Sequence, residues 1–171
     1  MVDTERYARH ISLPDVGITG QKLIDDSRVL VVGAGGLGSP VLMYLAAAGI
    51  GHIGVVDDDV VDLSNLQRQI IHSESAIGRP KVESAKERIN SINSAIKVTT
   101  WNARLSPDNA EEILCDWDIV IDGTDNIPTR YLVDDVCNML GIPWIYGSIY
   151  RFEGQVSLFN YQNGPCYRDL F

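Results

Sequence analysis

Residues 28–38 read RVLVVGAGGLG, and this stretch decides the fold of the chain. Its first part, residues 28–33, is a continuous apolar run that ends in glycine, which is typical of a buried strand. Its second part, residues 33–38, leads into residues 39–49, which have the alanine-rich composition of a helix. A strand, a glycine turn and a helix in this order predict the start of a nucleotide-binding α/β unit.

Strand and helix patterns alternate along the rest of the chain. Strand patterns cover residues 52–57, 97–102, 118–123, 144–150 and 154–160, and helical patterns cover residues 80–93, 106–114 and 127–140. This alternation predicts an α/β fold with a Rossmann-like, doubly wound, mostly parallel sheet. Only a few residues separate the last two strand patterns, so the C-terminal strand is expected to be antiparallel. In the helix at 106–114, Ser106 is expected to be the cap and Pro107 the first helical residue.

The chain divides into two parts by its pattern. Residues 1–27 predict an N-terminal helical extension of one or two helices outside the sheet, and residues 28–171 predict a nucleotide-binding domain. The sequence ends on an apolar pair, Leu170 and Phe171, which is expected of a domain truncated at its C-terminus.

Composition narrows the classes of protein to which the chain can belong. Its 171 residues suit one domain, and three cysteines fit a reducing compartment, so a cytoplasmic location is expected. Residues after Met1 are charged and show no secretory pattern, and the longest apolar run is too short to span a bilayer, so no membrane association is expected. A net charge of −9 argues against nucleic acid as a partner.

The glycine turn predicts a phosphate site. Gly33, Gly35 and Gly38 fit the pattern G-x-G-x-x-G, and Gly36 is a further residue without a Cβ atom. Such a turn lets the backbone approach a phosphate and aims a helix N-terminus at the anion. The alternative is a glycine-rich turn that binds nothing.

An acidic cluster follows the second strand. Asp57 ends this strand about twenty residues after the glycines, where nucleotide-binding folds place an acidic residue on the ribose hydroxyls. Asp58 and Asp59 are expected at the surface, although Asp59 could also face the site. At this point an adenine nucleotide and an NAD-type cofactor fit equally well.

The cations beyond the second strand favour a triphosphate. Arg68 and Lys81 are expected at the mouth of the cleft, where the charge of three phosphates needs dedicated cations. Asn65 and Gln67 are expected to add amide donors in the same loop, and Arg79 is expected at the surface.

The turn DGTDN, residues 122–126, closes the fourth strand. Ligands of open α/β sheets bind at the carboxyl ends of strands, so Asp125 and Asn126 are expected to contact the nucleotide there. A lone carboxylate is also a natural Mg²⁺ ligand beside phosphate oxygens, and Asp125 is expected to hold this ion. The alternative role of Asp125 is to cap the helix that follows, and Asp122 is expected to close the strand.

Several longer motifs occur together. They are RYARHI (6–11), GAGGLG (33–38), DLSNLQRQ (62–69), GRPKVESA (78–85), GTDN (123–126) and EGQVSLFNY (153–161). In this combination the chain resembles the MoeB/ThiF/HesA family of enzymes that activate ubiquitin-like sulfur-carrier proteins. The resemblance covers almost the whole chain.

The resemblance implies an adenylation. The C-terminal glycine carboxylate of a ubiquitin-like, MoaD- or ThiS-like carrier attacks the α-phosphorus of ATP. Pyrophosphate leaves, and the acyl adenylate serves sulfur transfer in molybdopterin, thiamin or related biosynthesis. ATP and Mg²⁺ are the implied cofactors, and residues 28–171 become an adenylation domain.

The resemblance also assigns roles to residues. It implies that Asp57 holds the ribose, that Asn65, Arg68 and Lys81 contact the phosphates, and that Asp125 organises Mg²⁺. Arg9 matches an arginine that the family supplies to the nucleotide across a dimer interface, so a homodimer is implied. Arg68, Lys81, Asp125 and Arg9 are thus the implied catalytic residues.

The cysteine pattern departs from the family. Family members commonly have C-x-x-C where this chain has Cys166 and Asp169, and no second pair follows. A tetrahedral structural zinc site needs four ligands, so no structural zinc is predicted.

Two other functions stay open at the level of sequence. An NAD-dependent oxidoreductase rests only on the glycine turn and Asp57, and a non-catalytic nucleotide-binding homologue is compatible with the missing cysteines. No nucleophile–base pair is evident. His10, His52 and His72 lie in no catalytic motif, and structural or surface roles are expected for them.

Overall fold

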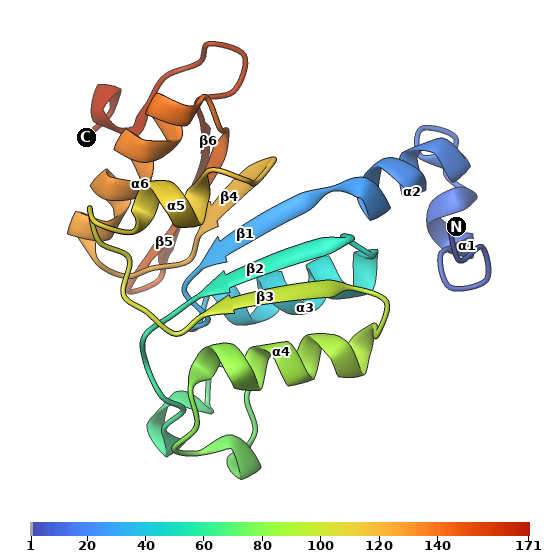
Figure 1. Cartoon of the computed structure of the whole chain (residues 1–171), viewed down its shortest axis with the longest axis horizontal. Helices are drawn as coiled ribbons and strands as arrows, with labels where there is room; N and C mark the ends of the chain where they lie inside the picture. Colours follow the sequence, from blue (N-terminus) through green and yellow to red (C-terminus); the bar gives the residue numbers. More distant parts are fainter. Residues whose placement is uncertain (1) are drawn as a thin grey trace.

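A computed structural model describes residues 2–171, and its centre is one six-stranded sheet in the order β3-β2-β1-β4-β5-β6 (Figure 1). The strands are β1 (Arg28–Val32), β2 (His52–Val56), β3 (Lys97–Trp101), β4 (Ile119–Asp122), β5 (Trp144–Tyr150) and β6 (Glu153–Phe159). The first five strands are parallel, and β6 is antiparallel to β5. The mostly parallel α/β class and the antiparallel C-terminal strand are therefore confirmed.

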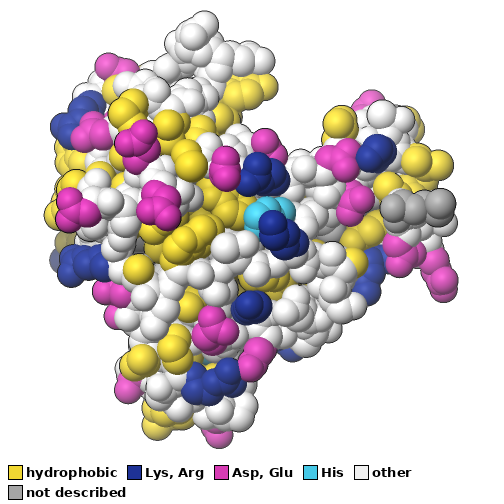
Figure 2. Space-filling model, viewed as in Figure 1, with side chains coloured by type: hydrophobic (Ala, Val, Ile, Leu, Met, Phe, Trp, Pro, Cys, Tyr) yellow, Lys and Arg dark blue, Asp and Glu magenta, His cyan; other side chains and the backbone are white. Residues whose placement is uncertain are grey.

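Helices cover both faces of the sheet (Figure 1). They are α1 (Ala8–Ile11), α2 (Gly17–Asp26), α3 (Gly38–Ala48), α4 (Lys81–Ile92), α5 (Ala110–Leu114) and α6 (Ile127–Leu140), with 3₁₀ turns η1 (Leu63–Asn65), η2 (Glu74–Ala76) and η3 (Tyr167–Asp169). None of the described helices combines the length and the apolarity needed to cross a bilayer. Lys and Arg side chains alternate with Asp and Glu on the face in Figure 2, which shows no continuous basic surface.

The central strand β1 shows why the sheet is doubly wound. Val29 and Val31 point into a core shared with α3 and α4, whereas Leu30 and Val32 point into a core shared with α5 and α6. Side chains alternate between the two faces of a strand, so a strand that is apolar at every position must be covered on both faces.

Helix α5 begins later than its sequence predicts. Asn109 accepts a hydrogen bond from the Ser106 N–H through Oδ1 at 2.8 Å, and its Nδ2 donates to the Arg104 carbonyl at 3.0 Å. These bonds hold residues 106–109 as a turn, and the helix starts at Ala110. The predicted cap at Ser106 and first helical residue at Pro107 are therefore wrong.

The N-terminal part of the chain forms two helices, α1 and α2, and Tyr7 anchors it to the end of α3. Gly49 ends α3 in the left-handed region at φ +86°, and a Cβ there would overlap the Tyr7 hydroxyl. Asn93 donates to this hydroxyl at 2.8 Å. Gln21, fully buried, donates to the Ala48 carbonyl at 3.0 Å. These contacts hold the extension at the end of the sheet where the parallel strands begin.

We expect the Leu30→Ala variant to lose about 2–5 kcal/mol of unfolding free energy, because Leu30 is fully buried and the truncation leaves a cavity. The matched control is Met139→Ala on α6, where the side chain is 62% exposed and the expected change is within about 0.5 kcal/mol. Urea denaturation followed by circular dichroism measures both. Equal losses in the two variants would contradict the assignment of β1 to the core.

Candidate functional site

A cavity of about 830 Å³ opens at the carboxyl ends of the parallel strands. Its walls come from the glycine turn after β1, the acidic residues after β2, the turn at 65–69, the segment 103–105 after β3, the segment 123–130 after β4, and residues 148–150 of β5. The chain winds to one side of β1 through β2 and β3, and to the other side through β4 and β5. Ligands of such folds bind at this switch point.

The glycine turn forms the floor of the cavity. Gly33 adopts a positive φ of +95°, and Gly33, Gly35 and Gly36 line the cavity. Gly38 is buried behind the turn and is absent from the lining. A Cβ at Gly38 would overlap the Gly33 carbonyl oxygen, so this glycine allows the close packing of the turn on the helix.

Asp57 joins the glycine turn to the end of β2. Its Oδ2 accepts from the Ala34 N–H at 2.8 Å, and its Oδ1 accepts from the Asp59 N–H at 2.9 Å. Burial raises the pKa of the Asp57 carboxyl, and these two backbone hydrogen bonds oppose the rise. Asp57 therefore lines the cavity and also fixes the glycine turn.

Lys81 reaches the same cavity from the first residue of α4. The residue is only 4% exposed, and its Nζ lies 2.7 Å from Asp59 Oδ2. Asp59 itself is largely exposed on the cavity wall. An ammonium has three donors, so Lys81 keeps further N–H groups for a ligand beside its ion pair with Asp59. Arg79, two residues earlier, is exposed and pairs with Glu87, as the sequence predicted for a surface cation.

A helical turn after η1 brings Asn65, Arg68 and Gln69 to the cavity. The N–H groups of Arg68 and Gln69 both donate to the Asn65 carbonyl, at 3.1 and 2.9 Å, and this spacing places the three side chains on one face. The Arg68 stem lies beside Gly36. Gln67 is exposed and lies outside the lining. The residue that the sequence analysis missed is Gln69, which is 3% exposed.

The turn after β4 settles which residue caps α6. Asn126 Oδ1 accepts from the Thr129 N–H at 2.9 Å, so Asn126 is the cap. Asp125 is thereby left exposed on the cavity wall, and the alternative role of Asp125 as the cap is excluded. Both residues line the cavity.

Asp122 lies beneath this turn. It is 1% exposed, its Oδ1 accepts from the Thr124 N–H at 2.8 Å, and its Oδ2 lies 3.8 Å from Arg130 Nε. Burial raises the pKa of Asp122 to about 6, against the opposing backbone hydrogen bond from Thr124 and the charge of Arg130. Asp122 therefore holds its proton more tightly in the folded chain than in the unfolded chain.

Arg130 is the second residue that the sequence analysis missed. It lines the cavity, donates through Nη2 to the Thr124 carbonyl at 3.0 Å, and lies 5.0 Å over the Tyr146 ring. Within the described residues, three buried atoms here lack hydrogen-bond partners: Asp122 Oδ2, Thr124 Oγ1 and Arg130 Nε. A cation near the start of a helix is electrostatically unfavourable. This unfavourable position of Arg130 was the feature of the sequence that could have indicated a role in the site.

Arg9 lies outside the cavity lining within one chain. It is an exposed residue of α1, which lies near the amino ends of the strands (Figure 1). The cavity is lined by residues at their carboxyl ends. Any contact between Arg9 and this site would have to come from a second chain.

Comparisons with known proteins agree on one family. The ThiF family model matches residues 7–171. A probable adenylyltransferase/sulfurtransferase MoeZ of Mycobacterium tuberculosis is 52% identical over 174 positions, which cover 99% of this chain and 44% of that protein. A probable molybdopterin-synthase adenylyltransferase of Porphyra purpurea is 53% identical, over 96% of this chain and 43% of that protein.

Solved structures show the same fold. Crystalline PaaA is 28% identical with a TM-score of 0.86, over 99% of this chain and 55% of that chain. Escherichia coli MccB with ATP is 26% identical with a TM-score of 0.85, over 95% of this chain and 51% of that chain. The chain thus spans less than half the length of the two curated relatives named above and about half of these structures.

We expect Asp122 to make stability rise as the pH falls. Its pKa of about 6 lies above the ordinary value of 3.8, so between these values the folded chain binds more protons than the unfolded chain. From pH 7 to pH 5 the wild type should gain about 1 kcal/mol of unfolding free energy relative to Asp122→Asn, which cannot titrate there. Urea denaturation at the two pH values measures this, and parallel changes in both proteins would contradict it.

Proposed function

The chain belongs to the ThiF family, and on this premise we propose that it adenylates the C-terminal carboxylate of a ubiquitin-like sulfur-carrier protein, using ATP and releasing pyrophosphate. The observation that carries the proposal is the meeting of the glycine turn, Arg68, Lys81 and Asp125 around one cavity. The relatives are named adenylyltransferases, and MccB was solved with ATP.

The cavity suits a reaction that needs charge neutralisation more than proton transfer. A terminal carboxylate has a pKa of roughly 3.5 and is already ionised at neutral pH, so its attack on the α-phosphorus needs no general base. Charge that builds on the departing phosphates is stabilised by preorganised cations and backbone N–H groups. Arg68, Lys81 and the glycine turn supply such groups, and the two cations favour a triphosphate over an NAD-type cofactor.

Each side chain has a role in this proposal. Asp57 accepts from the ribose hydroxyls while its inner contact holds Ala34. The Arg68 side chain lies beside Gly36, and the Lys81 ammonium lies beside Asp59. Both cations contact the phosphates in this proposal. Asn65 and Asn126 add amide groups at the two sides of the cavity.

Mg²⁺ fits the donors that the cavity presents. The Asp125 carboxylate is exposed on the wall and is free of the capping role that Asn126 takes. The carboxylates of Asp57, Asp58 and Asp59 also offer oxygens within 4.8 Å of one another. Mg²⁺ prefers one or two carboxylates together with phosphate oxygens, so Asp125 is the proposed ligand. When bound, the ion would offset the negative charge of the phosphates.

The proposed partners are a MoaD- or ThiS-like carrier and a second copy of this chain. The homodimer would bring Arg9 of one protomer to the cavity of the other. Large apolar side chains exposed in the extension and at the end of the sheet support such an interface; they are Leu13, Ile18, Leu23, Ile149, Tyr150, Phe152 and Val156. We place the reaction in the cytoplasm, in molybdopterin, thiamin or related biosynthesis.

The decisive test is carrier-dependent exchange of radioactive pyrophosphate into ATP. We expect Arg68→Ala and Lys81→Ala each to reduce exchange by about 100-fold or more, because each removes a cation from the charge that develops on the phosphates. Arg79→Ala is the matched control, since this cation is near Lys81 in sequence but pairs with Glu87 outside the cavity, and exchange should be nearly unchanged.

The same exchange assay is run with a panel of purified carrier proteins, and two outcomes would contradict the proposal. Normal exchange in both Arg68→Ala and Lys81→Ala would overturn the proposed roles of the cations. ATP binding without exchange for any carrier would instead indicate a nucleotide-binding protein that does not turn over.

Mixed dimers test the role of Arg9. Arg9→Ala and Lys81→Ala should each be inactive alone. A dimer with one copy of each has one cavity that contains Lys81 and receives Arg9 from its partner. Equal mixing after subunit exchange should therefore restore roughly a quarter of wild-type exchange, since half of the dimers are mixed and each has one intact site. A mixture no more active than its components would show that Arg9 is not shared.

A further inference from the structure

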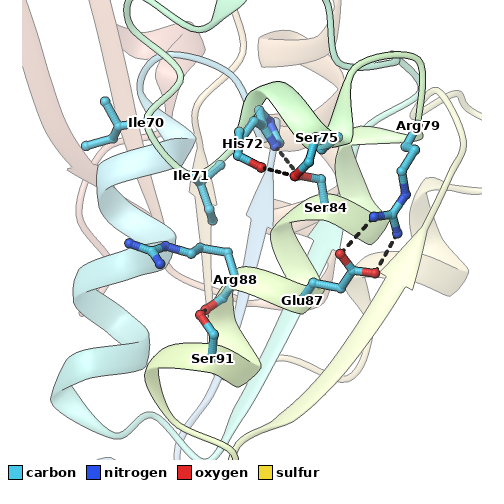
Figure 3. A pocket seen from close by; sticks show the side chains of 11 residues that line it. Ile70, Ile71, His72, Ser75, Arg79, Ser84, Glu87, Arg88 and Ser91 are labelled. Atoms are coloured by element: carbon cyan, nitrogen blue, oxygen red, sulfur yellow. Dashed lines mark hydrogen bonds and ion pairs between the residues drawn. The ribbon is translucent and has the colours of Figure 1, made fainter.

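His72 lines a second pocket, of about 400 Å³, beside α4 (Figure 3). The residue is only 8% exposed. Both ring nitrogens are engaged: Nδ1 lies 2.9 Å from Ser84 Oγ, and Nε2 lies 3.0 Å from the Ala34 carbonyl oxygen. Ser84 belongs to α4, and Figure 3 shows it facing the His72 ring. The ring thus connects α4 to the glycine turn.

The hydrogen bonds fix the protonation of this ring. The Ala34 carbonyl can only accept, so His72 Nε2 carries the hydrogen of that contact. Burial lowers the pKa of His72, so the ring is neutral near pH 7, Nδ1 accepts, and the Ser84 hydroxyl donates. Ser84 is itself buried at 5% exposure, which holds the ring in one orientation.

The Ala34 residue is therefore held at both of its polar groups. Asp57 accepts from its N–H, and His72 donates to its carbonyl. Ala34 has no exposed surface, so its carbonyl would be left buried and unpaired without His72.

The trans peptide bond carries this restraint to the cavity. In a planar trans peptide the carbonyl and the N–H of the next residue point in opposite directions. The Ala34 carbonyl points at His72, so the Gly35 N–H points away from it, and Gly35 lines the nucleotide cavity. We propose that His72 is a positioning residue that aims the Gly35 N–H at a nucleotide phosphate by holding the Ala34 carbonyl. This inference rests on the proposed ATP site.

The test compares binding of ATP with binding of adenosine. If His72 positions a hydrogen-bond donor for a phosphate, its loss weakens the binding of ATP and leaves the binding of adenosine, which has no phosphate, almost unchanged. A general loosening of the site weakens the binding of both. We expect His72→Leu, which has no donor, to raise the Kd for ATP about 10-fold or more and the Kd for adenosine less than about 3-fold. Isothermal titration calorimetry measures the Kd for ATP. A competition titration, in which ATP displaces bound adenosine, measures the Kd for adenosine.

Rescue by a conservative change is the second readout. His72→Gln restores an N–H donor at a similar reach, so its Kd for ATP should lie within about 3-fold of the wild type. Ser84→Ala removes the group that orients the ring and should give an intermediate loss, for ATP only. His52→Leu is the matched control, because His52 Nε2 bonds Thr99 Oγ1 at the opposite end of β2, and both affinities should be unchanged.

The outcomes separate this inference from the proposed function. A wild-type chain that fails to bind ATP overturns the proposed function and this inference with it. Wild-type ATP binding with equal losses for ATP and adenosine in His72→Leu overturns the positioning role alone. If His72→Leu does not fold, as judged by circular dichroism, Ser84→Ala decides: an unchanged ratio of the ATP and adenosine Kd values overturns the proposal.

Discussion

The shape of the glycine turn depends on how the N–H and the carbonyl of Ala34 are held. One side chain from the end of β2, Asp57, binds the N–H, and one from the loop before α4, His72, binds the carbonyl. Neither residue is near Ala34 in sequence, so the turn has its shape only when β2 pairs with β1 and α4 packs on the sheet. The close packing of Gly38 against Gly33 completes the turn from the other side. Assembly of the fold and preparation of the site are thus the same event.

The turn after β4 is held in a similar way. Asp122 accepts from the Thr124 N–H, and Arg130 donates to the Thr124 carbonyl. The free-energy cost is higher at this turn than at the glycine turn. A buried Asp122 oxygen that accepts no hydrogen bond and a buried Arg130 nitrogen that donates none both lose hydration. Such costs are usual where a site is shaped for a ligand, and stability elsewhere comes from the two apolar cores. The two turns face each other across the strand-order switch, and the cavity lies between them.

Prediction from sequence worked best where local pattern and final environment agree. The apolar runs of β1, β2 and β4 are buried on both faces, so their composition alone required a covered parallel sheet. It failed where one side chain redirects the backbone: Asn109 turns residues 106–109 away from the helix. It was incomplete between η1 and η2, where a helical turn brings Gln69 to the cavity. Periodicity over five residues is too short to be read without the neighbours that stabilise it.

The sequence by itself determined the fold class, the glycine turn and the presence of cations near that turn, because these depend on composition and spacing along the chain. Its longer motifs carried the resemblance to the family. Only the tertiary structure decided which polar groups meet. It paired Lys81 with Asp59, gave the α6 cap to Asn126 and freed Asp125, buried Asp122 against Arg130, and connected Ser84 through His72 to Ala34. Hydrogen bonds and ion pairs act over about 3–4 Å. Those of Lys81 and His72 join residues distant in sequence, which no local pattern encodes, and for the cap of α6 the sequence offered both Asp125 and Asn126.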